Sequence, residues 1–172
     1  MASAGSPPAV RTLLLIVHSR TGGSQAMAEA FVDGALCEPA LRLRTLQATA
    51  CRVEDMRSAA ALVFVGPENL GALSGAMKEL LDSSYYPLLD QMQGKRYAHL
   101  ICAGSDGHGA ARQLARILAG WRMVPLAQPL IAITGAQSRE AIEAPKILSP
   151  TDRDRCVELG QILATGLALG VY

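Results

Sequence analysis

The sequence predicts an α/β fold in which a parallel β-sheet is covered by helices on both faces. Five short apolar runs alternate along the chain with five segments whose apolar residues recur at helical spacing. The runs are apolar on both faces, which is typical of strands buried in a parallel sheet, and the helices between them provide right-handed crossovers. The chain of 172 residues has the size of one domain, and we expect residues 11–172 to form it.

Strands and helices are expected to follow one another in pairs. The strands are expected at residues 12–18, 41–46, 61–66, 97–103 and 128–134. The helices are expected at residues 24–36, 53–59, 72–83, 110–121 and 152–169. Gly94 precedes the fourth strand, Pro125 follows the fourth helix, and Thr151 or Asp152 can cap the last helix. Residues 135–150 have no assigned element, and a segment of this length often forms a functional or mobile loop.

Composition and charge exclude several classes of partner. Residues 1–10 are small, polar and proline-containing, so we expect a disordered tail rather than a secretion signal. The run Leu13–Val17 is too short to cross a bilayer, and we expect a cytoplasmic protein with no membrane span. The formal net charge of +1 argues against a polyanion-binding surface, so nucleic acid is not an expected partner.

The four cysteines predict neither a disulfide framework nor a metal site. They lie far apart, without C-x-x-C spacing and without a nearby histidine to complete a zinc site, so we expect free thiols. Cys51 and Arg57 have the C-x5-R spacing of a phosphatase nucleophile and its phosphate-binding arginine. Glu54 and Asp55 stand between them and would repel a phosphate, so we interpret this spacing as a coincidence.

The first expected strand ends at a loop suited to a phosphate group, formed by Ser19, Arg20, Thr21, Gly22, Gly23 and Ser24. A strand that leads through such a loop into a helix directs backbone N–H groups, hydroxyls and the positive helix end at one point. No lysine precedes Ser24, so this is not a Walker loop, and it is not a dinucleotide G-x-G-x-x-G either. The alternative interpretation is a polar helix cap.

Two further glycine-rich loops follow the third and fourth expected strands. The carboxyl ends of parallel strands meet at one edge of a sheet, so these loops, residues 66–75 and 103–109, are expected beside the first. Glycine and proline leave backbone groups free to pair with a flat, polar heterocycle. Taken singly, each loop also fits an ordinary strand-to-helix turn.

With these three loops, the chain resembles the flavodoxin-like flavoproteins, which bind flavin mononucleotide (FMN) without a covalent bond. The first loop, H-S-R-T-G-G-S-Q, is similar to the family's T/S-x-T-G-x-T phosphate loop. The second, G-P-E-N-L-G-A-L-S-G-A-M-K-E-L-L-D, is similar to the ring-binding loop and helix of NAD(P)H-dependent flavin reductases and WrbA-type quinone reductases. The resemblance implies a flavodoxin-like three-layer sandwich with a five-stranded parallel sheet of order 2-1-3-4-5.

The resemblance also implies which residues bind the cofactor. The first loop, Ser19 to Ser24, would surround the phosphate. The isoalloxazine ring would be lined by Pro67, Glu68, Asn69, Leu70 and Gly71, and its other side closed by Gly104, Ser105, Asp106 and Gly107. His108 either stabilises negative charge on the reduced flavin, contacts a substrate, or faces solvent. Lys78 and Asp82 match the family's helix and are expected to be solvated or capping groups.

The sequence also suggests roles for the remaining histidines and for three aromatic residues. His18, at the end of the first strand, is expected to orient the phosphate loop, and His99 to pack in the interior. Tyr85 and Tyr86 are expected to lie in the core or at the surface; the alternative is that they cover the flavin of a neighbouring subunit. Trp121 is expected to pack in the interior. No side chain need act as a catalytic acid or base, because the cofactor carries the chemistry.

The sequence departs from electron-carrier flavodoxins in two respects that bear on function. Its ring loops contain no aromatic residue and its net charge is close to neutral. A ring without aromatic stacking leaves one face open, which favours a reductase that uses NAD(P)H as co-substrate and a quinone or flavin as acceptor. A homodimer or homotetramer is implied. The alternatives are a one-electron carrier that docks on a redox partner, and a binding module without catalysis.

Overall fold

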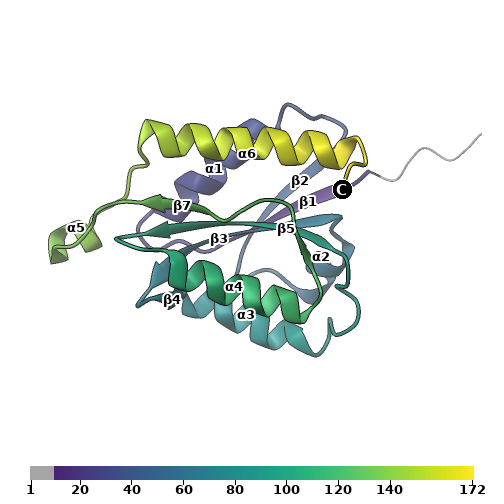
Figure 1. The fold of residues 1–172 in the computed structure, drawn as a ribbon, viewed down its shortest axis with the longest axis horizontal. Helices are drawn as coiled ribbons and strands as arrows, with labels where there is room; N and C mark the ends of the chain where they lie inside the picture. The colour runs from purple at the N-terminus through teal and green to yellow at the C-terminus, as the bar shows by residue number, and fades with distance from the viewer. Residues whose placement is uncertain (1–9) are drawn as a thin grey trace, which may run out of the picture.

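The structure, a computed structural model, describes residues 10–172 and has three layers. Residues 1–9, which contain most of the expected disordered tail, lie outside the described residues. A central sheet separates α1 (Gly23–Ala35) and α6 (Pro150–Ala168) on one face from α3 (Gly75–Tyr85) and α4 (His108–Gly120) on the other (Figure 1). The helix α2 (Val53–Ser58) packs on the same face as α3 and α4 through Met56.

The main strands of the sheet are parallel and have the expected order. They are β2 (Arg42–Gln47), β1 (Thr12–Val17), β3 (Ala61–Asn69), β5 (Arg96–Ala103) and, at the edge, β7 (Leu130–Ile133). The register pairs Leu15 with Thr45 on one side of β1 and with Val63 on the other. This arrangement confirms the predicted order 2-1-3-4-5, in which β5 is the fourth main strand and β7 the fifth.

Within residues 10–172, the sheet has seven strands in place of the five that were expected. The edge strand is divided: β6 (Val124–Pro125) pairs with the start of β5, and β7 pairs with its end. Pro129 stands just before β7 and has no N–H to continue the ladder, which accounts for the break. The other additional strand, β4 (Ala72–Leu73), turns back antiparallel onto the end of β3, so α3 begins at Gly75 rather than at the expected residue 72.

The interior consists of two apolar layers, one on each face of the sheet. Leu13, Leu15 and Val17 of β1 are fully buried beneath α1 and α6. Leu14 and Ile16 are equally buried but point to the α3 and α4 face. Strands that are apolar on both faces are therefore covered on both faces, as the sequence indicated.

The C-terminal third contains one short helix that the sequence did not indicate, α5 (Arg139–Glu143). The last helix begins at Pro150, two residues before the expected start, because the Ser149 hydroxyl accepts a hydrogen bond from the Asp152 N–H at 3.0 Å. Ser149 is thus the N-cap, where Thr151 or Asp152 was expected. Within residues 10–172, every helix is too short or too polar to span a bilayer.

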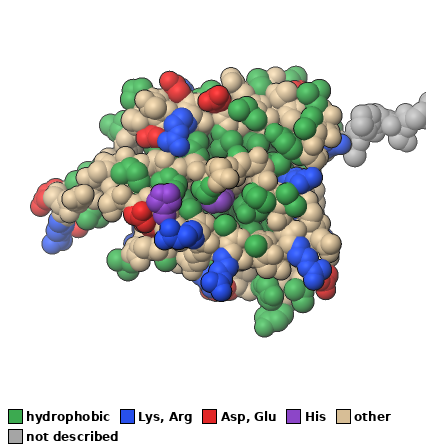
Figure 2. Space-filling view, viewed as in Figure 1, with side chains coloured by type: hydrophobic (Ala, Val, Ile, Leu, Met, Phe, Trp, Pro, Cys, Tyr) green, Lys and Arg blue, Asp and Glu red, His purple; other side chains and the backbone are tan. Residues whose placement is uncertain are grey.

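Charge is spread over the molecular surface without a large region of one sign on the face in view. Figure 2 shows basic, acidic and hydrophobic side chains interspersed over this face. This distribution agrees with the net charge of +1. Lys78 forms an ion pair with Asp82 one turn along α3, at 2.6 Å, so both are solvated surface groups as expected.

Candidate functional site

A cleft of about 730 Å³ lies at the carboxyl edge of the sheet. Its volume is within the range of about 300–1,000 Å³ that is usual for small-molecule sites. Four segments build it: the loop after β1, the turn after β3, the end of β5 and the segment after β7. The lining residues are Ser19, Arg20, Thr21, Gly23, Ser24, Pro67, Asn69, Leu70, Cys102, Ala103, Gly104, Thr134, Ala136, Ile142, Glu143 and Lys146.

The loop after β1 leads directly into the N-terminus of α1. Gly22 adopts a left-handed conformation with φ +90° as the N-cap, a conformation that only glycine adopts without strain. A Cβ on Gly23 would lie 2.5 Å from Cys102 Sγ, so the backbone here packs too closely on β5 for any side chain. The Ser19 hydroxyl accepts the Gly22 N–H at 3.1 Å and fixes the loop from within.

Ser24 carries the polar group that most directly suggests an anion in this loop. Its side chain is 2% exposed and its hydroxyl has no hydrogen-bond partner among residues 10–172. Buried hydroxyls are normally paired, and an unpaired one needs an explanation. Ser24 also lies in the first turn of α1, where the helix dipole favours negative charge. The loop therefore fits a phosphate group, which would accept a hydrogen bond from this hydroxyl.

The turn after β3 places an apolar side chain in the cleft. Leu70 and Gly71 connect β3 to β4 with φ values of +53° and +73°, both left-handed, as in the two-residue hairpin turns that follow strand twist. Leu70 is a non-glycine residue in this strained region, and its side chain is fully exposed at the cleft. Strain and exposure together make Leu70 a candidate for a ligand contact.

Glu68 does not line the cleft; it connects the second loop to the third. Its two carboxylate oxygens accept the backbone N–H groups of Gly107 and Ala110, both at 2.9 Å. Gly107 is the N-cap of α4 and has no side chain to cap the helix, so Glu68 supplies the cap from β3. The resemblance placed Glu68 against the ring, whereas the structure gives its carboxylate this structural contact.

The loop after β5 contributes less of the cleft than expected. Gly104 lines it, whereas Ser105, Asp106 and His108 are exposed outside the lining residues. Gly107 is buried with φ +81°, and a Cβ there would lie 2.5 Å from Ile131 Cγ2. Several predicted residues therefore do not line the cleft: Gly22, Glu68, Gly71, Ser105, Asp106, Gly107 and His108. Their contact with a cofactor stays a prediction.

The segment 135–148, which lies beyond the strand ends (Figure 1), supplies a wall that the sequence did not indicate. The Lys146 N–H donates to the Thr21 carbonyl at 2.7 Å, which ties this segment to the first loop. Ile142 and Glu143 of α5 line the cleft beside it. The unassigned stretch after the fifth expected strand was the available signal, because that strand also ends at the carboxyl edge of the sheet.

His18 links the first loop to the second. Its Nδ1 lies 2.8 Å from the hydroxyl of Ser74, the buried N-cap of α3. Burial lowers the pKa of His18 below its usual value, and the nearby Arg20 guanidinium lowers it further. Both effects favour the neutral form of the imidazole. The expectation that His18 orients the phosphate loop is consistent with this contact.

The remaining sequence candidates lie away from the cleft. His99 is 2% exposed, and burial lowers its pKa to about 4. Trp121 is also buried, with its ring stacked on Tyr85 at 6.1 Å, so both His99 and Trp121 pack as expected. Tyr85 and Tyr86 end α3 at the opposite edge of the sheet and are partly or largely exposed. No group of three metal-ligating side chains occurs in residues 10–172.

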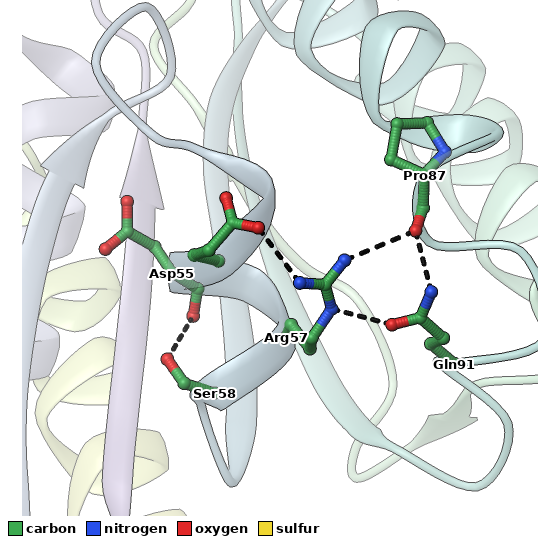
Figure 3. Close-up of polar contacts among 6 residues, drawn as sticks. Asp55, Arg57, Ser58, Pro87 and Gln91 are labelled. Carbon is green, nitrogen blue, oxygen red and sulfur yellow. Dashed lines mark hydrogen bonds and ion pairs between the residues drawn. The ribbon is translucent and has the colours of Figure 1, made fainter.

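The C-x5-R spacing does not form a phosphatase site. The Arg57 guanidinium is occupied by Glu54, by Gln91 at 2.6 Å and by the Pro87 carbonyl (Figure 3). Burial, with the nearby Asp55 carboxylate, raises the pKa of Cys51 to about 12, so its thiol is not a nucleophile at neutral pH. The interpretation as a coincidence is confirmed. All four cysteines are free thiols, as expected.

The fold defines the class of protein: a flavodoxin-like α/β protein with a cleft at the carboxyl edge of the sheet. A family model described as NADPH-dependent FMN reductase matches residues 21–138. The chain belongs to this family of FMN-binding oxidoreductases.

Individual relatives agree with this assignment at the level of the fold. A flavodoxin of Aquifex aeolicus (strain VF5) is 25% identical over 92% of this chain and 88% of its own length. A flavodoxin, WrbA-like protein from Agrobacterium tumefaciens has a TM-score of 0.71 at 18% identity, covering 93% of this chain and 98% of its own. Two-electron reduced flavodoxin from Megasphaera elsdenii has a TM-score of 0.69 at 15% identity, covering 89% and 98%.

Proposed function

We propose that this protein is an FMN-dependent oxidoreductase that takes electrons from NADPH or NADH and passes them to a quinone or to another flavin. Bound FMN supplies the redox chemistry, since it accepts a hydride and releases electrons to an acceptor. The protein binds the phosphate, orients the ring and controls which molecules reach it. The family match supports FMN as the cofactor and NADPH as the electron donor. The lining of the cleft supports the proposal that a second flat molecule can reach the flavin ring.

The phosphate is proposed to bind at the N-terminus of α1. Ser24 and Thr21 provide hydroxyls, Gly22 and Gly23 provide a backbone without side chains, and all except Gly22 line the cleft. The unpaired, buried hydroxyl of Ser24 is the group in this loop that a phosphate would satisfy. Arg20 adds a positive charge at the rim.

The observation that carries the reductase proposal is the aliphatic nature of the walls. Within residues 10–172, the cleft lining contains no aromatic side chain, and its exposed apolar side chains are Leu70 and Ile142. An aromatic ring can stack on a flavin and cover its face, whereas two aliphatic side chains at the rim leave room for a second flat molecule. A nicotinamide ring and a quinone are both flat and would occupy this space in turn.

A one-electron carrier is the second candidate, and one specific observation favours it. The relative from Aquifex aeolicus and several structural neighbours are described as flavodoxins. A carrier would receive and give electrons through a docked protein and would have no need of space for nicotinamide above the ring. A binding module that has kept the fold without catalysis is the third candidate.

Anaerobic mixing of the FMN-loaded protein with NADPH separates these candidates. We expect the yellow colour to bleach within seconds to minutes and to return when a quinone is added. Dithionite serves as the control, since it reduces bound flavin in either case. A protein that dithionite bleaches and neither NADPH nor NADH bleaches is a carrier, and the reductase proposal falls. Failure to bind FMN at micromolar concentration would leave the binding module.

The assembly is proposed from the family resemblance, and the location from the sequence. We propose that residues 11–172 act as one domain, assembled as a homodimer or homotetramer in the cytoplasm. Cys37 is an exposed free thiol, which suits a reducing compartment. Light scattering of the purified protein measures the assembly directly, and a single monomeric mass would contradict it.

A further inference from the structure

Lys146 is placed in the cleft by a contact that no loop motif contains. Its backbone N–H donates to the Thr21 carbonyl at 2.7 Å, and its side chain lies over the start of α1. A Cβ added to Gly23 would lie 3.2 Å from Lys146 Cβ and 3.5 Å from its Cγ. The aliphatic stem of Lys146 therefore crosses the first loop, and Lys146 lines the same cleft as Thr21 and Ser24.

The Lys146 ammonium group is held by backbone carbonyls rather than by a carboxylate. It donates to the carbonyls of Ala141 at 2.7 Å, Ile142 at 2.8 Å and Ala144 at 2.5 Å, which end α5. None of the ion pairs within residues 10–172 includes Lys146. The positive charge at this wall of the cleft is therefore not neutralised by a protein anion in direct contact.

Other charged groups around Lys146 do not cancel it. Glu143 lines the cleft but pairs with Arg139 at 3.1 Å on the exposed side of α5. Asp152 pairs with Arg155 at 2.8 Å. Burial raises the pKa of the Cys102 thiol, which lies against the Gly23 position; the Lys146 charge lowers this pKa and the Asp152 carboxylate raises it.

We propose that Lys146 is a phosphate-binding residue of the FMN site, delivered from the segment 135–148 to the loop after β1. This inference rests on the proposed function, because it takes FMN as the ligand of the cleft. The ammonium group exchanges part of its bonding to the α5 carbonyls for the phosphate, which as a dianion forms the stronger, charge-assisted hydrogen bond. Lys146 thus adds a cation to a loop that otherwise offers hydroxyls, N–H groups and Arg20.

The test compares FMN with riboflavin, which has the same ring and lacks the phosphate. The ratio of the two dissociation constants, measured by fluorescence quenching, reports on the phosphate contacts alone. For Lys146→Met we expect the preference for FMN to fall about tenfold or more, as for loss of a charge-assisted contact. Lys146→Arg keeps the charge and is expected to stay within about threefold of the unmodified protein.

Arg116→Gln is the control. It also removes one positive charge, but Arg116 is exposed on α4, does not line the cleft and forms none of the ion pairs within residues 10–172. Its FMN-to-riboflavin ratio should stay within about twofold of the unmodified protein, because exposed charges are screened.

Three results decide the matter. A selective loss of FMN affinity in Lys146→Met, with riboflavin unchanged, supports the proposal. A parallel loss of both ligands overturns it, because Lys146 would then only shape the wall through α5. Unchanged affinity for both ligands also overturns it. If the unmodified protein binds FMN normally in these last two cases, the proposed function stands; if it binds neither ligand, the proposed function fails instead.

Discussion

Replacing Glu68 should destabilise the protein although the residue belongs to neither core layer. Glu68→Ala removes the acceptors of two backbone N–H groups, those of Gly107 and Ala110, both bonded at 2.9 Å. Hydrogen bonds to a charged group contribute about 1.5–3 kcal/mol each. Since Glu68 is half-buried and water can replace part of the loss, we expect the free energy of unfolding to fall by about 2–4 kcal/mol.

Urea unfolding of the FMN-free protein at 25 °C measures this change. Glu68→Gln keeps one acceptor oxygen and should lose about 1–2 kcal/mol, between the unmodified protein and Glu68→Ala. Glu79→Ala is the control, because Glu79 is an exposed acid on α3, and such surface changes stay within about 0.5 kcal/mol. In melting temperature, the Glu68→Ala change corresponds to about 4–16 °C for a chain of this size. If Glu68→Ala and Glu79→Ala are equally stable, Glu68 does not cap α4 and the reasoning is wrong.

Three further predictions concern the cofactor, pH and the thiols. Thr21→Ala combined with Ser24→Ala should weaken FMN binding by about 2–5 kcal/mol in a fluorescence titration and leave riboflavin binding unaffected, since only the phosphate contacts are lost; unchanged FMN affinity would remove the first loop from the site. The unfolded chain protonates His99 near pH 6.5 and the folded chain only near 4, so the unfolded state binds more protons between these values. Stability should therefore fall by about 2 kcal/mol from pH 8 to pH 5 through this residue, and urea unfolding of His99→Leu should lack that part of the pH dependence; an identical pH dependence in the variant would contradict the burial argument. In native protein iodoacetamide should modify the exposed Cys37 and leave Cys51, whose pKa is raised to about 12, unmodified until urea is added; mass spectrometry of labelled peptides that shows early modification of Cys51 would contradict this.

The fold could be predicted from the sequence because its signals are local. Leu13 to Val17 is an unbroken apolar run, and each residue of it is fully buried between two helical layers. A glycine pair just after that strand marks the start of α1. The division of the edge strand into β6 and β7 was not predicted. Pro129 interrupts its hydrogen bonds to β5, and the sequence alone does not show which residues pair with β5.

Part of the cleft could not be predicted because its contacts join distant segments through the backbone. Glu68 bonds N–H groups 39 and 42 residues further along the chain, and no pattern in the sequence specifies which carboxylate caps which helix. Leu70 occupies a left-handed turn position that asparagine or glycine would usually mark. The Lys146 N–H to Thr21 carbonyl bond involves no side chain, so the residue types at its two ends carry no signal of it.

The bond between Lys146 and Thr21 has a consequence for comparisons across the family. The stretch that matches the family model ends at residue 138, and Lys146 lies after it. With the proposed role of Lys146, flavin reductases that share the first three loops would differ in how firmly they retain their cofactor, depending on which residues of their own chains lie over the start of the first helix. Retention of flavin during purification would then vary among close relatives with identical phosphate loops, and grafting the C-terminal third from one to another would transfer it.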